Sequence, residues 1–270
     1  MPSPMGLPMS WIASINWLYS VSGFAIGMLV GFTGVGGGSL MTPLLVLLFG
    51  FHPATAVGTD LLYAGLTKSG GTIVHGLNRT VDWRITARLA CGSLPGAAMT
   101  LWALSYVDRT SQSTAGTINT VLGLALIFTA ITLIGRKWLL VRLAERTGSF
   151  TDRQTATLTV VLGAVLGVLV SLTSVGAGAI GVTVLLLLYP RMPTVRIVGS
   201  DIAHAVPLTL LAGAGHWSMG SVDGVLLTSL LIGSLPGIAI GSQIASRVSD
   251  RLLRPVLAGT LALVGAKLAF

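Results

Sequence analysis

Charged residues are scarce in this sequence. Only 9% of its 270 residues are Asp, Glu, Lys or Arg, whereas 53% are hydrophobic. Because a water-soluble domain carries roughly a quarter charged residues, this chain has too few of them to cover a surface in water. The scarcity excludes the soluble globular class. Since apolar runs recur along the whole length, we expect one integral membrane domain whose solvent is the lipid bilayer.

Cysteine and catalytic motifs are also scarce. Cys91 is the only cysteine, so neither an intrachain disulfide nor a cysteine-based metal site can form. The sequence has no phosphate-binding loop ending in Gly-Lys-Ser or Gly-Lys-Thr, and no cluster of His and acidic residues with metal-ligand spacing. We therefore expect no metal, no cofactor and no enzymatic activity. Residues 1–10 contain no Lys or Arg, so the basic start of a secretory signal is missing and we expect this end to be retained.

Acidic residues are fewer than basic ones, 8 against 16, which gives a net charge of +8. In a soluble protein this excess would indicate a nucleic-acid partner. Here the basic residues gather in a few short loops, the pattern that sets the orientation of membrane proteins, so we expect no nucleic-acid partner. The most basic of these loops, at 136–153, is predicted to be cytoplasmic; it holds Arg136, Lys137, Arg142, Arg146 and Arg153.

Ten apolar segments fill the chain, at residues 11–34, 39–50, 55–75, 83–105, 114–135, 155–174, 179–190, 195–215, 222–244 and 252–270. Most are close to the roughly 20 residues that a helix needs to cross about 30 Å of hydrocarbon. Segments 39–50 and 179–190 reach only about 18 Å as helices, too short to cross alone. Each of the two follows a glycine-rich stretch, 32–40 or 172–180, where an ordinary membrane helix would not be interrupted.

The two halves of the chain repeat one another. Residues 57–61 (Val-Gly-Thr-Asp-Leu) match residues 198–202 (Val-Gly-Ser-Asp-Ile), and Gly-Ser-Leu-Pro-Gly occurs at both 92–96 and 233–237. The offset between the halves is 140 residues up to Pro53 and 141 residues further on. So much matched order indicates a duplication of one membrane unit.

Corresponding loops of the two repeats differ in charge. Residues 76–84 are basic and predicted to be cytoplasmic, whereas their counterpart, 217–222, holds no Lys or Arg. The repeats are therefore predicted to be inverted, with an odd number of segments each and both termini external. The alternative is a parallel duplication with eight spans. The predicted parts are a first membrane repeat (1–135), a cytoplasmic linker (136–154) and a second membrane repeat (155–270).

These patterns predict an all-α polytopic membrane protein of two inverted five-segment repeats, each with a Gly-broken helical hairpin and a short half-helix. Irregular backbone at membrane depth is tolerated only inside protein or beside a cavity, and the helix that starts after each break directs its N–H groups and dipole at an anion. Close helix packing through small residues is the alternative reading of the glycines. The candidate substrate-binding residues are Thr33, Gly36, Gly37, Gly38, Ser39, Thr42, Lys68, Thr173, Ser174, Gly176 and Gly178.

Ionisable residues inside apolar segments are functional candidates by default. Lys68 is matched by neutral Thr209, which leaves one intramembrane positive charge to attract an anion, unless its side chain snorkels to the interface. Asp60, Asp201 and His204 are candidates for proton coupling. The two aspartates follow Gly-Thr and Gly-Ser, so capping a helix start is an alternative for them, and hydrogen-bonded packing is one for His204.

With these motifs, the chain resembles the TauE/SafE family of sulfite exporters. The resemblance rests on residues 34–39 with Pro43, on residues 58–61 followed by Lys68 and His75, on residues 81–83 and on residues 92–96. It covers nearly the whole chain and implies a bacterial or archaeal inner-membrane transporter of small sulfur-containing anions, such as sulfite or organosulfonates. Residues 176–179 (Gly-Ala-Gly-Ala) are poorer in glycine than their counterpart, which departs from two equal half-sites.

The predicted function is a proton-coupled secondary transporter that holds a small anion at the midplane, between the two glycine-rich breaks. A passive anion channel of the same fold is the alternative, and a membrane scaffold without transport is a third reading. The expected partners are the anionic substrate and the bilayer, and the sequence is compatible with a homo-oligomer.

Overall fold

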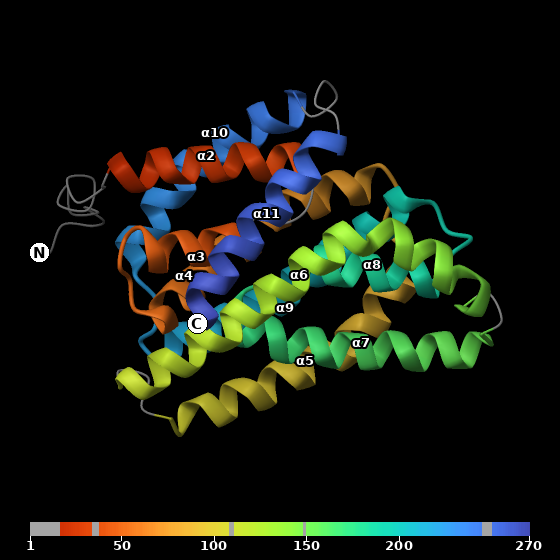
Figure 1. The fold of residues 1–270 in the computed structure, drawn as a ribbon, viewed down its shortest axis with the longest axis horizontal. Coiled ribbons are helices and arrows are strands. Elements are labelled where there is room, and N and C mark those ends of the chain that lie inside the picture. The colour runs from red at the N-terminus through yellow and green to blue at the C-terminus, as the bar shows by residue number, and fades with distance from the viewer. Residues whose placement is uncertain (1–16, 34–37, 108–110, 148–149, 245–249) are drawn as a thin grey trace, which may run out of the picture.

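The computed structural model describes residues 17–33, 38–107, 111–147, 150–244 and 250–270, and in these ranges every regular element is a helix. Figure 1 shows the helices packed as one bundle. In chain order they are α2 (Trp17–Thr33), α3 (Gly38–Leu47), α4 (Pro53–Leu77), α5 (Trp83–Ser105), α6 (Gln112–Thr147), α7 (Asp152–Thr173), α8 (Ala179–Leu188), α9 (Thr194–Ser218), α10 (Gly224–Ile244) and α11 (Asp250–Ala269).

These helices fall on the ten predicted apolar segments, which confirms the all-α polytopic architecture. The two short segments are short helices. α3 and α8 contain 10 residues each, which corresponds to about 15 Å of helix. Neither can cross a bilayer alone, as the sequence predicted.

α6 is longer than predicted. It has 36 residues and continues to Thr147, through most of the region predicted as a linker at 136–154. No Gly or Pro interrupts residues 136–147, which are rich in good helix formers such as Leu, Arg and Ala, and Gly148 follows. The basic residues therefore extend a helix beyond its apolar part, Gln112–Arg136.

The surface and the interior of the bundle have the distribution expected in lipid. Large apolar side chains such as Phe128, Ile131 and Leu263 are exposed, whereas Asp60 and Asp201 are buried. Within the described residues, four stretches of helix are long and apolar enough to cross a membrane by length and composition: Gln112–Arg136, Asp152–Thr173, Thr194–Ser218 and Gly224–Gly241. An apolar outside around a polar inside fits a bilayer rather than water as the solvent.

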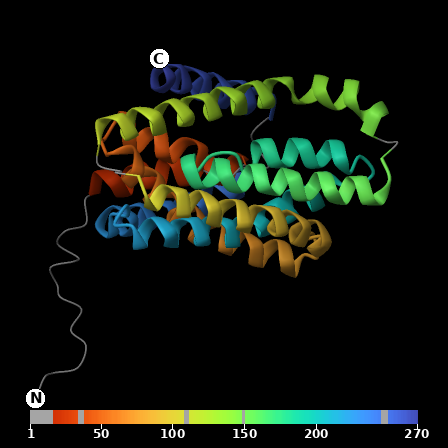
Figure 2. The same ribbon diagram turned by 90° about the horizontal axis from the view of Figure 1, so that it is seen from below.

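The main contacts pair helices from different halves of the chain. α2 packs on α10, α5 on α7, α4 on α9, and α6 on α11. Figure 1 shows the α2–α10 and α5–α7 pairs at opposite edges of the bundle, and Figure 2 shows α6 and α11 together on one face. Because α2 and α7 are repeat counterparts, as are α5 and α10, the first two pairs are equivalent.

The equivalent pairs also touch at equivalent glycines. A Cβ atom on Gly23 would clash with the backbone of Leu230, and one on Gly163 would clash with the backbone of Leu89. Gly23 and Gly163 are counterparts, and so are Leu230 and Leu89. The same close approach of two backbones therefore occurs twice, once between α2 and α10 and once between α5 and α7.

α4 and α9 form a central antiparallel pair of counterparts. Gly58, early in α4, packs against Ser221 just after α9, and Gly199, early in α9, packs against Thr80 just after α4. Exchanging the two halves exchanges these two contacts. Inverted repeats produce this arrangement, and the inversion across a membrane itself stays a prediction.

Candidate functional site

The second glycine-rich stretch breaks the chain between α7 and α8. Ser174 follows the last residue of α7 in a left-handed conformation, with φ of 58°, and Gly176 and Gly178 have φ of 123° and 111°. Such backbone is open to glycine and strained for other residues. No side chain caps the start of α8, so the first N–H groups of this helix are left for another acceptor.

The candidate residues of the first glycine-rich stretch are only partly described. Gly36 and Gly37 lie outside the described residues. Thr33 ends α2, and Gly38 and Ser39 begin α3, while the side chains of Thr33 and Ser39 lie outside the described part of the chain. The prediction that both breaks face one cavity therefore stays a prediction.

Asp60 connects the two halves near these breaks. Its fully buried carboxylate accepts a hydrogen bond of 2.5 Å from the hydroxyl of Thr42 on the short helix α3. The hydroxyl of Ser174, at the break of the second repeat, lies beside the same carboxylate. One carboxylate of α4 thus lies between the half-helix of its own repeat and the break of the other.

Asp201 takes the corresponding position in the second repeat. Its side chain is buried and lies near the backbone N–H of Gly178. A Cβ atom on Gly181 would come within 2.5 Å of the Oδ1 atom of Asp201. The carboxylate therefore faces the first turn of α8, where the helix dipole favours a negative charge.

Neither aspartate caps its own helix. α4 begins at Pro53 and α9 begins at Thr194, so both carboxylates lie two turns inside. The alternative reading, in which Asp60 and Asp201 cap helix starts, is therefore wrong. The chain continues as helix on the N-terminal side of the Gly-Thr-Asp and Gly-Ser-Asp motifs because no breaker other than one glycine precedes them.

Lys68 is the cation that both carboxylates share. Its ammonium group interacts electrostatically with Asp201 and with Asp60, although within the described part of the chain no carboxylate lies within 4.0 Å of it. Along α4, Lys68 follows Gly65, which packs on Thr209, and precedes Gly71, which packs on Ile202. Lys68 therefore lies about one turn from the point where equivalent residues of α4 and α9 cross.

His204 extends this group of residues toward α5. It is fully buried, and its Nε2 atom forms a hydrogen bond of 2.8 Å with the Ser93 hydroxyl. Lys68 acts on it electrostatically. In the first repeat the counterpart of His204 is Tyr63, so only one repeat offers an imidazole here.

The structure brings together Thr42, Asp60, Lys68, Ser174, Gly178, Asp201 and His204 from the candidate set. Thr173 differs from them, because its hydroxyl donates to the carbonyl of Leu169 at 2.6 Å and accepts from the N–H of Val175 at 3.1 Å. It holds the shape of the break instead of being free for a ligand. Among the described residues, no group of three His, Cys, Asp or Glu side chains is placed to hold a metal ion.

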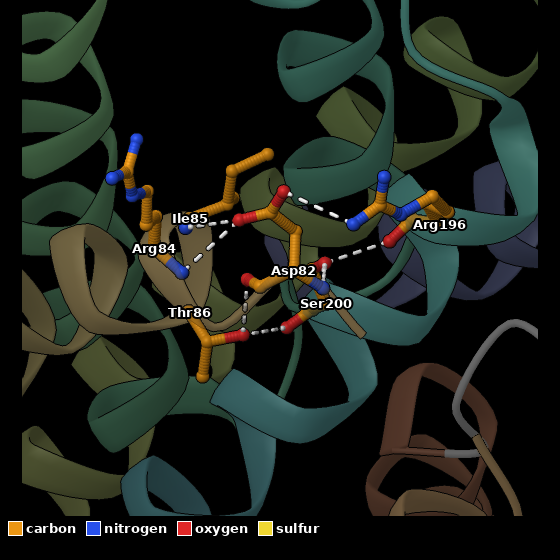
Figure 3. Close-up of polar contacts among 6 residues, drawn as sticks. All are labelled: Asp82, Arg84, Ile85, Thr86, Arg196 and Ser200. Atoms are coloured by element: carbon orange, nitrogen blue, oxygen red, sulfur yellow. Dashed lines mark hydrogen bonds and ion pairs between the residues drawn. The ribbon is translucent and has the colours of Figure 1, made fainter. Parts of the chain in front are cut away.

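One polar contact between the repeats was not anticipated from the sequence (Figure 3). Asp82 caps α5 by accepting from the N–H groups of Arg84 and the next residue. Its own N–H donates to the Ser200 hydroxyl at 2.8 Å, and Arg196 approaches its carboxylate at 3.4 Å. Ser200 also accepts at its carbonyl from Thr86, at 3.3 Å. The start of α5 is thereby fastened to α9.

The same contact recurs at the opposite end of the α4–α9 pair. The N–H of Asp223 donates to the Thr59 hydroxyl at 3.1 Å, and Asp223 also accepts from the N–H of Leu226 at 2.9 Å, as a helix cap. The signal for these contacts was present in the sequence: a hydroxyl residue directly precedes each buried aspartate, Thr59 before Asp60 and Ser200 before Asp201.

Comparisons with known proteins agree with this architecture. The chain is 38% identical over 247 residues to the probable membrane transporter protein YjnA of Bacillus subtilis (strain 168), which covers 91% of this chain and 96% of that protein. It is 29% identical to YdhB of the same organism, covering 92% and 97%, and 22% identical to MJ0441 of Methanocaldococcus jannaschii, covering 92% and 93%. Both are also named as probable membrane transporters.

No solved structure matches the chain. The family described as sulfite exporter TauE/SafE matches residues 19–268. This range includes both short helices and all four ionisable residues of the candidate site, Asp60, Lys68, Asp201 and His204. The chain therefore belongs to the TauE/SafE family of membrane transporters.

Proposed function

We propose that this protein is a secondary transporter that moves a small sulfur-containing anion, sulfite or an organosulfonate, across the inner membrane together with protons. One observation carries the proposal. Asp60 and Asp201 are buried at equivalent positions beside the short helices, and Lys68 interacts electrostatically with both. Ionisable groups inside a membrane bundle mark the paths of ions and substrates.

The charge balance of this group supports proton coupling. With both aspartates ionised, the three side chains Asp60, Asp201 and Lys68 sum to one negative charge, which would repel an anion in a medium of low dielectric constant. Protonation of one carboxylate makes the group neutral, and protonation of both leaves the ammonium of Lys68 free for the anion. Proton uptake then precedes anion binding, which couples the two in symport.

The polar groups around the aspartates complete a site of suitable strength. The N–H groups at the start of α8, the hydroxyls of Thr42 and Ser174, and the ammonium of Lys68 all supply donors. Dipoles and hydroxyls hold an oxyanion without the full strength of several cations, so the anion can be released again. These features support reversible binding, as transport requires.

The proposed orientation follows the basic residues. The end of the bundle with Arg191, Arg196 and the basic end of α6 is cytoplasmic, and both termini are external. The two repeats then present the group around Lys68 alternately to either side.

Uptake of labelled sulfite into proteoliposomes under an imposed pH gradient tests the proposal. We expect accumulation above equilibrium, its loss in Lys68→Ala and its retention in Thr209→Ala, the matched variant of the other repeat. Flux that stops at equilibrium would instead assign a passive anion channel. Absence of any flux in the wild type, for sulfite and organosulfonates alike, would overturn the substrate class.

A further inference from the structure

A hollow of about 350 Å³ opens where α5, α7 and α9 meet the turn that follows α8. Its polar lining residues are Arg88, Asp152, Thr155, Tyr189, Arg191 and Arg196. Small-molecule sites have volumes upward of about 300 Å³, so a small ligand fits. Asp60, Lys68, Asp201 and His204 do not line this hollow. The hollow is therefore separate from the proposed transport site.

Two arginines of the hollow are held in place with most of their donors unused. The Nη1 atom of Arg88 donates to the Tyr189 hydroxyl at 3.1 Å, and that hydroxyl also forms a hydrogen bond of 2.9 Å with Thr159. The Nη2 atom of Arg196 approaches Asp82 at 3.4 Å (Figure 3). A guanidinium carries five N–H donors, and among the described residues each of the two side chains uses one. Positioned guanidinium forks with free donors suit an oxyanion.

The equivalent region of the first repeat is filled with aromatic rings. Phe49 and Phe51 stand where the second repeat has Tyr189 and Arg191. The ring centroid of Tyr19 lies 5.0 Å from that of Phe49 and 5.7 Å from that of Phe51, and all three rings pack against a buried apolar cluster. At this place the first repeat therefore packs aromatic side chains together, whereas the second repeat has a hollow lined by basic residues.

The other two arginines are also unique to this end. The counterpart of Arg88 is the neutral residue Ser229, and Arg196 lies in residues 194–197, which stand opposite the uncharged residues 54–56. Among the described residues, three arginines and one carboxylate, Asp152, line the hollow, so this lining is positively charged even though Asp82 offsets part of Arg196. The departure from the repeat thus consists of added positive charge beside this hollow.

We propose that this hollow binds an oxyanion of phosphate chemistry, which reaches it as free phosphate or as the headgroup of an anionic lipid. Basic pockets between membrane helices recognise such headgroups on the cytoplasmic side, and this end of the bundle carries the basic residues that predict that side. The three arginines bind the oxygen atoms, and Tyr189 holds Arg88 in position. This binding is independent of the transported substrate.

The test uses the full chain in nanodiscs. In discs of phosphatidylcholine, inorganic phosphate is titrated by calorimetry; in discs containing phosphatidylglycerol, native mass spectrometry counts the lipid retained after gentle extraction. The variants are Arg191→Phe and Arg88→Ser, which introduce the residues of the first repeat. Arg84→Gln is the matched control, because Arg84 is exposed at the same end and does not line the hollow.

We expect the first two variants to weaken binding at least about tenfold, Arg84→Gln to leave it unchanged, and Asp152→Asn to strengthen it several-fold. Binding in the phosphate arm assigns a free oxyanion, and binding only in the lipid arm assigns a headgroup. Arg191 is exposed, so Arg191→Phe is expected to fold and keeps the test valid if Arg88→Ser does not. Absence of binding in both arms, or equal weakening by Arg84→Gln, would overturn the proposal.

Discussion

The same kind of hydrogen bond is made at both ends of the α4–α9 pair, yet the charges around these two bonds differ. The N–H of Asp82 reaches the Ser200 hydroxyl at 2.8 Å, and the N–H of Asp223 reaches the Thr59 hydroxyl at 3.1 Å. Arg196 joins only the first of these contacts. The hydrogen bonds between the repeats are therefore duplicated, whereas the ion pair beside them is not.

The same difference between shared and unshared residues is seen at the candidate site around Asp60 and Asp201. Both repeats keep the aspartate, but only the first has Lys68 and only the second has His204. The packing residues must work in both copies because the α2–α10 and α5–α7 pairs are two copies of one contact, whereas a single cation near the crossing of α4 and α9 interacts electrostatically with both aspartates. The comparison therefore separates the residues that pack the helices together from those that we propose to bind the anion and the protons.

The largest expected effect comes from the duplicated helix packing. A Cβ atom on Gly92 would clash with the backbone of Val160, and one on Gly233 with that of Ser20. Because backbone cannot yield as a flexible side chain does, Gly92→Val and Gly233→Val should each cost about 3 kcal/mol or more and deplete folded protein. Fluorescence-detected size exclusion measures this. Gly116→Val is the control, since nothing lies near a Cβ at Gly116, and unequal losses at Gly92 and Gly233 would break the equivalence.

Lys68→Ala should lower sulfite uptake about 100-fold, because loss of one partner from a buried set of charges costs about 2–5 kcal/mol. Thr209→Ala should change uptake little, because the Thr209 hydroxyl donates to backbone carbonyls of its own helix, those of Ala205 at 2.8 Å and Val206 at 3.3 Å. The exchange variant Lys68→Thr with Thr209→Lys sharpens the comparison. Since both positions lie close to the crossing of α4 and α9, it should regain part of the uptake in proteoliposomes; equal loss in both variants would place Lys68 outside the chemistry.

The aspartates should separate coupling from binding. Asp60→Asn and Asp201→Asn remove a proton-binding group while keeping its shape, so accumulation driven by a pH gradient should be lost while exchange of labelled for unlabelled sulfite continues. Thr42→Val removes only the hydroxyl that donates to Asp60 and should slow uptake about three- to tenfold. Gradient-driven accumulation that survives in both asparagine variants would assign the coupling elsewhere.

The two fastened ends should give the smallest effects. Ser200→Ala and Thr59→Ala each leave one N–H without its acceptor, so each should lower the stability by about 1–3 kcal/mol, seen as a lower unfolding temperature in detergent. Arg196→Gln removes a partly exposed ion pair and should cost at most about 1 kcal/mol. A larger loss from Arg196→Gln than from Ser200→Ala would mean that the ion pair, and not the shared hydrogen bond, fastens this end.

Much of the fold could be predicted because its signals are local. The length of each apolar run set the helices, and the glycine-rich stretch before Ala179 predicted the break that the structure describes there. The continuation of α6 to Thr147 differs from the linker predicted at 136–154. The charged residues of this region are compatible with a loop and with a helix. Basic residues mark the side of a membrane well and the end of a helix poorly.

The candidate site was predicted in part, because residue types are visible in a sequence and distances are not. Ionisable residues in apolar segments selected Asp60, Lys68, Asp201 and His204. That Lys68 acts on both aspartates depends on the antiparallel packing of α4 on α9, which only the tertiary structure gives. The hollow near Arg191 was missed for the same reason, since its arginines come from separate elements.

The place of Lys68 has a consequence for the direction of transport. If two inverted repeats exchange conformations as proposed, paired residues such as Asp60 and Asp201 trade surroundings, whereas a residue near the crossing, such as Lys68, keeps most of its own. A substrate arriving from either face would meet the same ammonium at the same depth. Under the proposed mechanism, we therefore expect the direction of transport to follow the gradients that the cell maintains.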